Sequence, residues 1–214
     1  MELHLYGDSI MKGVRWDGER YKLCEHRNFE ALGEKGVTVV NRSQMGATVE
    51  KGLALWREEE KEKTVLFEYG GNDCDFDWQA VSDDPGAKHE PHVTPERFCE
   101  QYEKLIRQAQ AQGNRVILSR LVPVDAEKYF AWISRGRSKE NILAWLGDVG
   151  RLARWQERYD RLVCELAARL DCPLLDLRDP FLARRDFASL LCADGIHPTQ
   201  AGHDLIEQTL CKTL

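Results

Sequence analysis

The sequence predicts an α/β protein built on a central sheet of about five parallel strands, with helices covering both faces. Two observations lead to this prediction. Short runs rich in β-branched and aromatic residues alternate with longer segments whose apolar residues recur at helical spacing. Strands separated by helices are usually parallel, because right-handed crossovers return each strand in the same direction. The 214 residues suffice for a single domain, 1–214, with its own core.

The expected strands are five short apolar runs, at residues 2–6, 37–41, 64–69, 115–119 and 173–176. A helix is expected to begin at Thr94, a typical N-cap, with Pro95 in its first position, and to stop at Gly113. A second helix is expected over residues 152–170, where apolar side chains keep the helical period. A third is expected to open near Thr199 and to end the chain.

Composition and charge narrow the classes of partner. The chain is 43% hydrophobic and 31% charged, which is ordinary for a folded globular protein. Its net charge of -6 and pI of about 5.6 argue against nucleic acid and anionic membrane surfaces as partners, because both would repel it. No apolar stretch approaches the length needed to span a bilayer. Small neutral or cationic ligands remain open, and the oligomeric state is not predicted.

The cysteines and the N-terminus indicate a cytoplasmic protein. Seven cysteines, an odd number, are scattered without a C-x-x-C pair, which is typical of reduced thiols. Met1 leads directly into the first predicted strand, without the basic and apolar regions of a secretion signal.

Chemically useful residues follow several of the predicted strands. In open α/β sheets, binding sites lie beyond the carboxyl ends of the strands. Ser9 follows the first strand, in LYGDSIMKGV, and Gly46 follows the second, in NRSQMGATVEKGL. Asn72 follows the third, in EYGGNDCDFDW, and the fifth is followed by CADGIHPTQAGH, which contains Asp194 and His197.

These residue types fit acyl transfer through a nucleophilic serine. A serine hydroxyl needs a base, and His197 is the natural candidate because the pKa of histidine lies near neutrality. Asp194 would fix the tautomer of that histidine and stabilise its charged form. When Ser9 attacks an ester carbonyl, the resulting oxyanion needs donors, which the backbone amides of Ser9 and Gly46 and the side chain of Asn72 would supply.

The pattern resembles the SGNH hydrolase superfamily of GDSL-type esterases and lipases. The matching blocks are GDS at residues 7–9, Gly46 in NRSQMGAT, Asn72 in GGND, and Asp194 with His197 in DGIHP. Ile10 stands where many members have leucine, a conservative change. The resemblance spans nearly the whole chain. Residues 121–149 resemble a segment found in a subgroup of uncharacterised members without a signal sequence. The family resemblance implies a flavodoxin-like, three-layer α/β/α fold and ester hydrolysis through an acyl-enzyme, without a metal or other cofactor.

Other readings of single motifs remain open. Asp73, Asp75 and Asp77 alternate as in a calcium loop, but the sixth and twelfth positions are Trp78 and Asp84, which argues against one. His89 and His92 are expected to be exposed loop residues without zinc-protease spacing, and Cys192 a packed small residue. A non-catalytic binding module on the same fold is a further alternative.

A segment around residues 121–150 is expected to form a helical insertion near the site. Its aromatic residues, together with those after the third strand, either wall a substrate pocket or pack the insertion onto the body. The candidate substrate-binding residues are Asp8, Asp73, Phe76, Trp78, Tyr129 and Trp132, with Phe130 and Trp145 as further wall residues. Asp8 is expected to hold the serine turn and not to act as a second base.

The predicted function is therefore hydrolysis of small or short-chain carboxylic esters, such as acetyl esters of carbohydrates. A thioesterase or a lysophospholipase of the same family is the alternative. A small-molecule ester is the expected partner.

Overall fold

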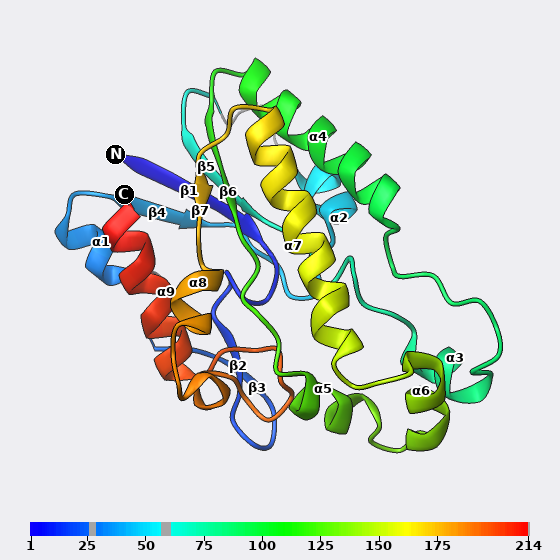
Figure 1. The fold of residues 1–214 in the computed structure, drawn as a ribbon. Coiled ribbons are helices and arrows are strands. Elements are labelled where there is room, and N and C mark those ends of the chain that lie inside the picture. The colour runs from blue at the N-terminus through cyan, green and yellow to red at the C-terminus, as the bar shows by residue number, and fades with distance from the viewer. Residues whose placement is uncertain (26–28, 57–60, 214) are drawn as a thin grey trace.

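A five-stranded parallel sheet forms the centre of the protein (Figure 1). The computed structural model describes residues 1–25, 29–56 and 61–213. The strands lie in the order β4-β1-β5-β6-β7, and each neighbouring pair is parallel. Their bounds are β1 Glu2–Gly7, β4 Thr38–Asn41, β5 Thr64–Glu68, β6 Arg115–Ser119 and β7 Leu174–Leu175. Counted along the chain, this is the order 2-1-3-4-5 of flavodoxin-like sheets, so the predicted fold class is confirmed.

Helices cover both faces of this sheet, as Figure 1 shows. One face carries α2 (Val49–Leu55), α4 (Pro95–Ala111) and α7 (Arg151–Arg169). The other carries α1 (Glu30–Glu34), α8 (Arg178–Leu182), the short 3₁₀ helix η1 (Phe187–Leu190) and α9 (Gln200–Thr213). Three further helices, α3 (Trp78–Asp83), α5 (Ala126–Ile133) and α6 (Lys139–Leu146), lie beyond the carboxyl ends of the strands.

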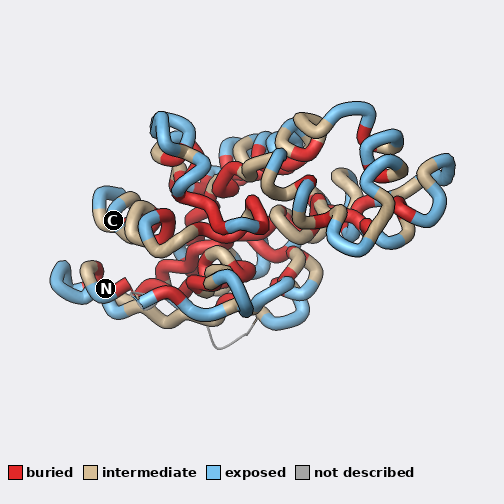
Figure 2. The backbone as a smooth tube through the Cα atoms, turned by 90° about the horizontal axis from the view of Figure 1, so that it is seen from below, coloured by how far each residue is buried: buried red, intermediate tan, exposed pale blue. Residues whose placement is uncertain are grey.

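Alternation along the strands divides the core into two layers. Phe67 and Leu118 pack toward α2, α4 and α7, whereas Leu66 and Ile117 pack toward α8 and α9. This follows from the strand geometry, because successive side chains point to opposite faces. Figure 2 shows the resulting buried middle layer, with exposed backbone on the outer turns of the helices.

The predicted long helices are present with small boundary shifts. The Thr94 side chain accepts a hydrogen bond from Arg97 N, and Pro95 is the first residue of α4. Gly113 follows the end of α4 with a φ of 80°, a left-handed conformation that glycine adopts readily. Helix α7 begins at Arg151 and α9 at Gln200, each one residue from its expected start.

A small antiparallel hairpin of β2 (Val14–Trp16) and β3 (Tyr21–Leu23) was not among the predicted elements. Each strand has three residues and a partly exposed face, so the apolar alternation is too short to stand out. Its turn is stabilised locally, because Asp17 Oδ1 accepts hydrogen bonds from Glu19 N and Arg20 N.

The segment after β6 folds as a helical insertion. Helices α5 and α6 pack with α3 in an apolar cluster that includes Phe76, Trp78, Phe130, Ile142 and Leu146. Within the described part of the chain, no helix is long and apolar enough to cross a membrane.

His203 joins α9 to the hairpin by a hydrogen bond, and its burial should make the stability of the fold sensitive to acid. Its Nε2 donates to Val14 O at 3.0 Å, and burial lowers the pKa of the imidazole to about 4. Below about pH 6.5 the unfolded chain binds a proton that the folded state excludes, so stability falls as the pH drops toward 4. Lowering the pH from 7 to 5 should therefore reduce the unfolding free energy of the wild type by about 2 kcal/mol more than that of His203→Gln, which lacks the imidazole. Urea titrations of both proteins check this, and parallel pH profiles would contradict it.

Candidate active site

Three side chains from opposite ends of the sequence form a continuous hydrogen-bonded chain at the carboxyl edge of the sheet. Ser9 Oγ lies 2.9 Å from His197 Nε2, and His197 Nδ1 lies 2.7 Å from Asp194 Oδ2. All three residues are buried, Asp194 completely. With Nδ1 donating to the carboxylate, Nε2 is left as the acceptor for the serine hydroxyl.

Ser9 lies in a tight turn directly after β1. Asp8 Oδ1 accepts a hydrogen bond from Ile10 N at 2.7 Å, and Val14 N donates to Ser9 O at 2.9 Å. Gly7, the last residue of β1, is required by close packing, since a Cβ there would lie 2.9 Å from Glu68 Oε2. The residues of the GDS block thus fix the position of the serine through backbone contacts.

The loop that carries Asp194 and His197 is fixed in a similar way. Asp194 Oδ1 accepts hydrogen bonds from Ile196 N and His197 N, at 3.1 and 3.0 Å. Gly195 has a φ of 76°, and a Cβ there would lie 2.4 Å from Tyr129 N of α5. Gly195 O also accepts a hydrogen bond from Asp125 N, so the insertion packs directly against this loop.

The charge of Asp194 is stabilised despite its burial. Burial would raise its pKa, but hydrogen bonds from the His197 ring and from two backbone amides outweigh this effect and hold the pKa below its usual value. Tyr21 of the hairpin covers the histidine, with ring centroids 4.9 Å apart. Asp194 therefore remains a carboxylate that can stabilise a protonated His197.

The candidate oxyanion donors lie in adjoining loops. Asn72 Nδ2 donates to Asp8 Oδ2 at 2.9 Å and to Ala47 O at 3.2 Å, so it bridges the neighbours of Ser9 and Gly46. Gly46 has a φ of 70°. Neither Ser9 N nor Gly46 N donates a hydrogen bond to another residue that the structure describes. Both amides are thus available as donors, whereas the amide of Asn72 is shared with two protein acceptors.

A pair of buried carboxyl groups lies behind the serine turn. Asp8 N donates to Glu68 Oε2 at 3.3 Å, and both side chains are 2% exposed. Burial raises the pKa of both groups, and repulsion from Asp8 raises that of Glu68 further. Two buried carboxylates at this distance would repel each other, so we assign one proton to the pair and place it on Glu68. Asp8 is then the carboxylate that accepts from Ile10 N and Asn72 Nδ2.

Asp73 has a structural position outside the cavity. Its Oδ1 accepts a hydrogen bond from Val49 N, the first residue of α2, at 2.9 Å. Burial raises the pKa of Asp73 to about 7. This contact holds the start of α2, and with it the loop of Gly46, against the GGND block.

A cavity of about 820 Å³, including its open mouth, adjoins Ser9 and His197. Of the predicted substrate-binding residues, Asp8, Phe76, Trp78 and Tyr129 line it, as does Trp145. The structure does not bring Asp73, Phe130 or Trp132 into this wall. Phe130 packs inside the insertion, and Trp132 lies against Trp16 and Tyr21, because the unpredicted hairpin occupies that side of α5.

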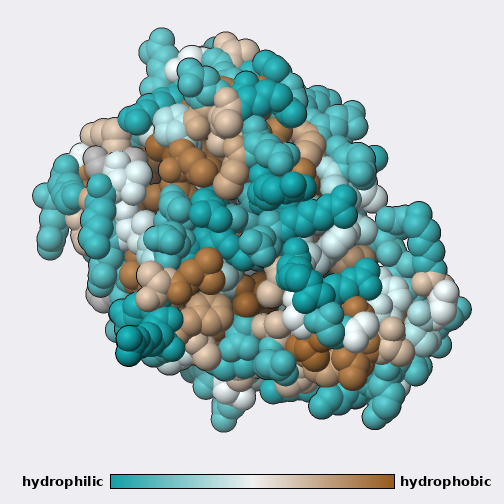
Figure 3. Space-filling model, in the orientation of Figure 1, coloured by the Kyte–Doolittle hydropathy of each residue, from teal (hydrophilic) through white to brown (hydrophobic). Residues whose placement is uncertain are grey.

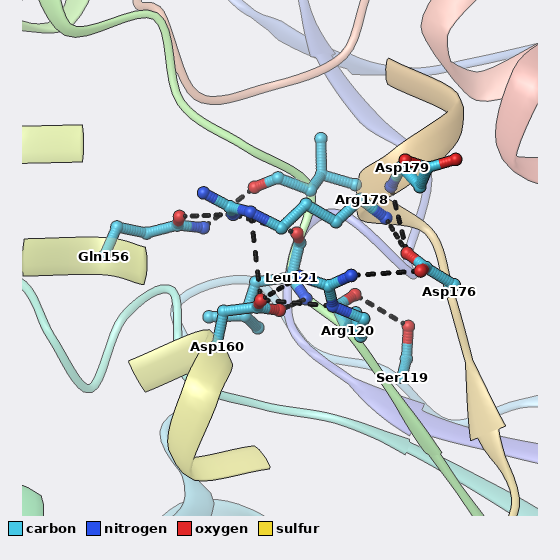
Figure 4. Close-up of polar contacts among 9 residues, drawn as sticks. Ser119, Arg120, Leu121, Gln156, Asp160, Asp176, Arg178 and Asp179 are labelled. Carbon is cyan, nitrogen blue, oxygen red and sulfur yellow. Dashed lines mark hydrogen bonds and ion pairs between the residues drawn. The ribbon is translucent and has the colours of Figure 1, made fainter. Parts of the chain in front are cut away.

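Polar groups beside the cavity are joined in a network of hydrogen bonds and ion pairs (Figure 4). Gln156 of α7 lines the cavity, and its Oε1 accepts a hydrogen bond from Arg178 Nη1 at 2.8 Å. Its amide nitrogen donates to Val122 O. Asp160 accepts from Arg120 Nη2 at 2.6 Å and from Leu121 N at 2.9 Å. This network fixes the chain after β6 where it passes under the site.

The structure gives no support to a calcium loop at Asp73, Asp75 and Asp77 or to Cys192 as a nucleophile. Asp77 is exposed and caps α3 by accepting hydrogen bonds from Gln79 N and Ala80 N, whereas Asp73 is buried. Among residues 1–25, 29–56 and 61–213, no group of three or more His, Cys, Asp or Glu side chains is arranged to hold a metal ion. Cys192 is buried, with its Sγ 3.3 Å from Pro198 O.

Several residues at the site escaped sequence reasoning. Glu68 reads as the last residue of a buried strand, and Tyr21 belongs to the unpredicted hairpin. The sequence pattern indicates Asp75 only as a candidate calcium ligand, and Arg151 lies just before the helix expected over residues 152–170. For Glu68 the available signal was an acidic residue in an otherwise apolar strand, TVLFE.

Comparison with known proteins gives one family and a set of similar folds. Residues 5–205 match the model of the GDSL-like Lipase/Acylhydrolase family. The uncharacterized lipoprotein YqeF of Bacillus subtilis (strain 168) is 24% identical over 179 residues, which cover 80% of this chain and 68% of YqeF.

Two solved structures illustrate the similarity of the fold. The lipase/acylhydrolase from Enterococcus faecalis superposes with a TM-score of 0.71 at 21% identity, covering 99% of this chain and 94% of the other. A variant of Axe2, an acetyl xylan esterase from Geobacillus stearothermophilus, gives a TM-score of 0.69 at 21% identity, with coverage of 99% and 93%.

Proposed function

Because the chain belongs to the GDSL-like lipase/acylhydrolase family, we propose that it hydrolyses small or short-chain carboxylic esters with Ser9 as nucleophile. The observation that carries the proposal is the unbroken hydrogen-bond path from Ser9 Oγ through His197 to Asp194. A binding module without turnover would not need these three groups joined in this order.

In the first half of the reaction, Ser9 Oγ attacks the ester carbonyl while its proton passes to His197 Nε2. The imidazolium then lies against the carboxylate of Asp194. As the tetrahedral intermediate collapses, His197 returns that proton to the leaving alcohol, and the acyl group stays on Ser9. A water molecule, deprotonated by the same imidazole, then attacks the carbonyl of the acyl-enzyme. Collapse of this intermediate breaks the bond to Ser9 Oγ, which takes the proton back from His197 as the acid leaves.

The oxyanion is stabilised by Ser9 N, Gly46 N and the Asn72 amide. The two backbone amides are available without rearrangement. Asn72 contributes by turning the Nδ2 hydrogen that it donates to Ala47 O toward the oxyanion, while the other stays on Asp8. Donors fixed before the reaction are effective because they need no reorganisation when the negative charge forms.

Compact substrates, such as acetyl esters of carbohydrates, are the class that we favour. On the face seen in Figure 3, hydrophobic residues gather in separate patches and form no continuous apolar band for a long acyl chain. The acetyl xylan esterase among the similar folds adds a precedent for acetyl groups on a carbohydrate. Residues 1–214 form one domain in this proposal, and the helical insertion contributes to the pocket.

The cytoplasm is the compartment that we propose. All seven cysteines are free thiols, and four of them are buried. Unpaired cysteines in this number favour a reducing environment. The name of YqeF as a lipoprotein is the competing indication. Cell fractionation of an organism that expresses the chain decides between them.

A chain-length series tests the proposed activity. We expect kcat/KM for p-nitrophenyl esters to be highest for acetate or butyrate and to fall by at least about 10-fold at decanoate, because a long acyl chain would displace water from the polar side chains that line the cavity, such as Asp75 and Arg151. A maximum at decanoate or beyond would favour a lysophospholipase. Faster cleavage of acetyl thioesters than of oxygen esters would favour a thioesterase. Absence of turnover on every ester would contradict the proposal.

Truncating Asn72 to alanine tests the oxyanion assignment. We expect kcat for p-nitrophenyl acetate to fall by about 10²-fold with KM changed by less than about 3-fold, since the oxyanion exists mainly in the transition state. Steady-state kinetics and the Tm are measured together. An increase in KM alone would instead indicate ground-state binding.

A further inference from the structure

Apart from the proposed catalytic groups and the carboxyl pair of Asp8 and Glu68 behind the serine turn, one acidic and one basic side chain line the cavity beside Ser9. Asp75 follows the GGND block, and Arg151 opens helix α7. Their positions raise the question of which part of a substrate they contact, and this inference rests on the proposed esterase function.

Asp75 is held firmly but retains capacity as an acceptor. Trp78 Nε1 donates to Asp75 Oδ1 at 2.8 Å, and Tyr129 OH donates to the same oxygen at 2.5 Å. Both side-chain donors use Oδ1, and the backbone amide of Phe76 also donates to this carboxylate, which leaves Oδ2 with lone-pair capacity for a further partner. An oriented carboxylate in a partly enclosed wall is a strong acceptor for a hydroxyl group.

Arg151 is fixed in a comparable way. Its Nη1 donates to Trp145 O at 3.0 Å and Leu146 O at 3.4 Å, at the end of α6. Its guanidinium lies over the Trp145 ring, 4.8 Å from the centroid. Because both hydrogen bonds use Nη1, Nη2 remains as a donor.

Five aromatic residues line the cavity as well, beside aliphatic ones such as Leu121, Val124 and Leu152; the aromatic residues are Phe76, Trp78, Tyr129, Trp145 and Trp155. Flat apolar surfaces combined with a few fixed planar polar groups suit a ring that has both C–H faces and hydroxyl edges. We propose that Asp75, Arg151 and these aromatic residues form a subsite for the alcohol part of the ester, and that this subsite selects a single sugar ring or a similarly compact polyol.

The composition of the wall argues against two other occupants. An aromatic wall with one carboxylate also suits a quaternary ammonium group, but the guanidinium of Arg151 in the same wall would repel a cation. A purely hydrocarbon alcohol would leave Asp75 Oδ2 and Arg151 Nη2 without partners once water is displaced, which costs binding energy.

Matched substrates test the subsite. We compare mono-acetylated methyl glucoside with cyclohexyl acetate, which has a ring of the same size without hydroxyls, and with acetylcholine. For the wild type we expect kcat/KM to be at least about 10-fold higher for the sugar ester than for either of the others. Equal values for the two ring esters, or the highest value for acetylcholine, would overturn the proposal.

Variants identify the residue responsible. Asp75→Asn keeps an oxygen for Trp78 and Tyr129 but replaces the free acceptor by a donor, so the ratio of sugar ester to cyclohexyl acetate should fall at least about 10-fold. Asp83→Asn, the same change at an exposed residue of α3, should leave the ratio as in the wild type. An unchanged ratio in Asp75→Asn would overturn the assignment.

A binding measurement separates this inference from the proposed function. Saturation-transfer NMR on the Ser9→Ala protein with methyl glucoside needs no turnover and no variant of Asp75. Saturation of the sugar ring protons supports the subsite even if no ester is cleaved. If Ser9→Ala shows no saturation at millimolar sugar while the wild type hydrolyses p-nitrophenyl acetate, the subsite is overturned and the esterase function stands.

Discussion

Ser9→Ala is expected to lower kcat for p-nitrophenyl acetate by at least about 10⁴-fold. The substitution removes the one hydroxyl that lies 2.9 Å from His197 Nε2 and leaves every backbone contact of the turn in place. Any remaining turnover would come from binding, from the oxyanion donors and from water activated by His197.

The fold should tolerate this change. Ser9 is buried, and its side chain is bonded to His197 alone among the described residues, so the Tm should shift by no more than a few degrees. Stopped assays with purified protein and a thermal melt check both statements. Turnover within about 10-fold of the wild type in a folded Ser9→Ala protein would contradict the assignment of the nucleophile.

Asp194→Asn is expected to lower kcat by about 10⁴-fold while the protein stays folded. An asparagine can orient its amide toward His197 Nδ1, which favours the tautomer with the proton on Nε2 and so removes the base that Ser9 needs. It also removes the negative charge that lies 2.7 Å from the ring and stabilises the imidazolium. Steady-state kinetics of p-nitrophenyl acetate hydrolysis give the measurement.

A matched exposed carboxylate provides the control for this variant. Asp179 lies on the surface of α8, so Asp179→Asn applies the same chemical change away from the cavity. We expect its kcat to equal that of the wild type. A loss below about 10-fold in Asp194→Asn would show that His197 does not depend on this carboxylate.

The strands and long helices could be predicted because each has a local physical cause. Residues 115–119 form a short apolar run, and they form β6 with the same bounds. Helix α4 has a capping threonine, a proline in its first position and a glycine after its end. The parallel order of the strands follows from their alternation with helices, which is a rule about connections and not about single residues.

The candidate site could be predicted in part, because the positions of its blocks follow from the same rule. Loops after parallel strands share one edge of the sheet, and the structure brings Ser9 and His197, which are 188 residues apart, within hydrogen-bond distance at that edge. The blocks predict which loops meet. They do not predict how Asn72 divides its donors between Asp8 and Ala47.

The wall of the pocket could not be predicted to the same degree. Trp132 and Tyr129 lie three residues apart on α5, yet Tyr129 faces the cavity and Trp132 packs on the hairpin. The difference depends on a hairpin of three-residue strands, whose sequence carries little periodic signal. The carboxyl pair of Asp8 and Glu68 likewise depends on contact across 60 residues, between the ends of two neighbouring strands.

Covalent labelling of Ser9 tests the central claim most directly, namely that His197 and Asp194 activate this hydroxyl. The wild type, treated with a p-nitrophenyl alkylphosphonate, is predicted to gain the mass of one phosphonyl group, and peptide mapping should locate it on Ser9. Ser9→Ala should gain none. Absence of the adduct on the folded wild type, or an adduct at another residue that persists in Ser9→Ala, would contradict the account.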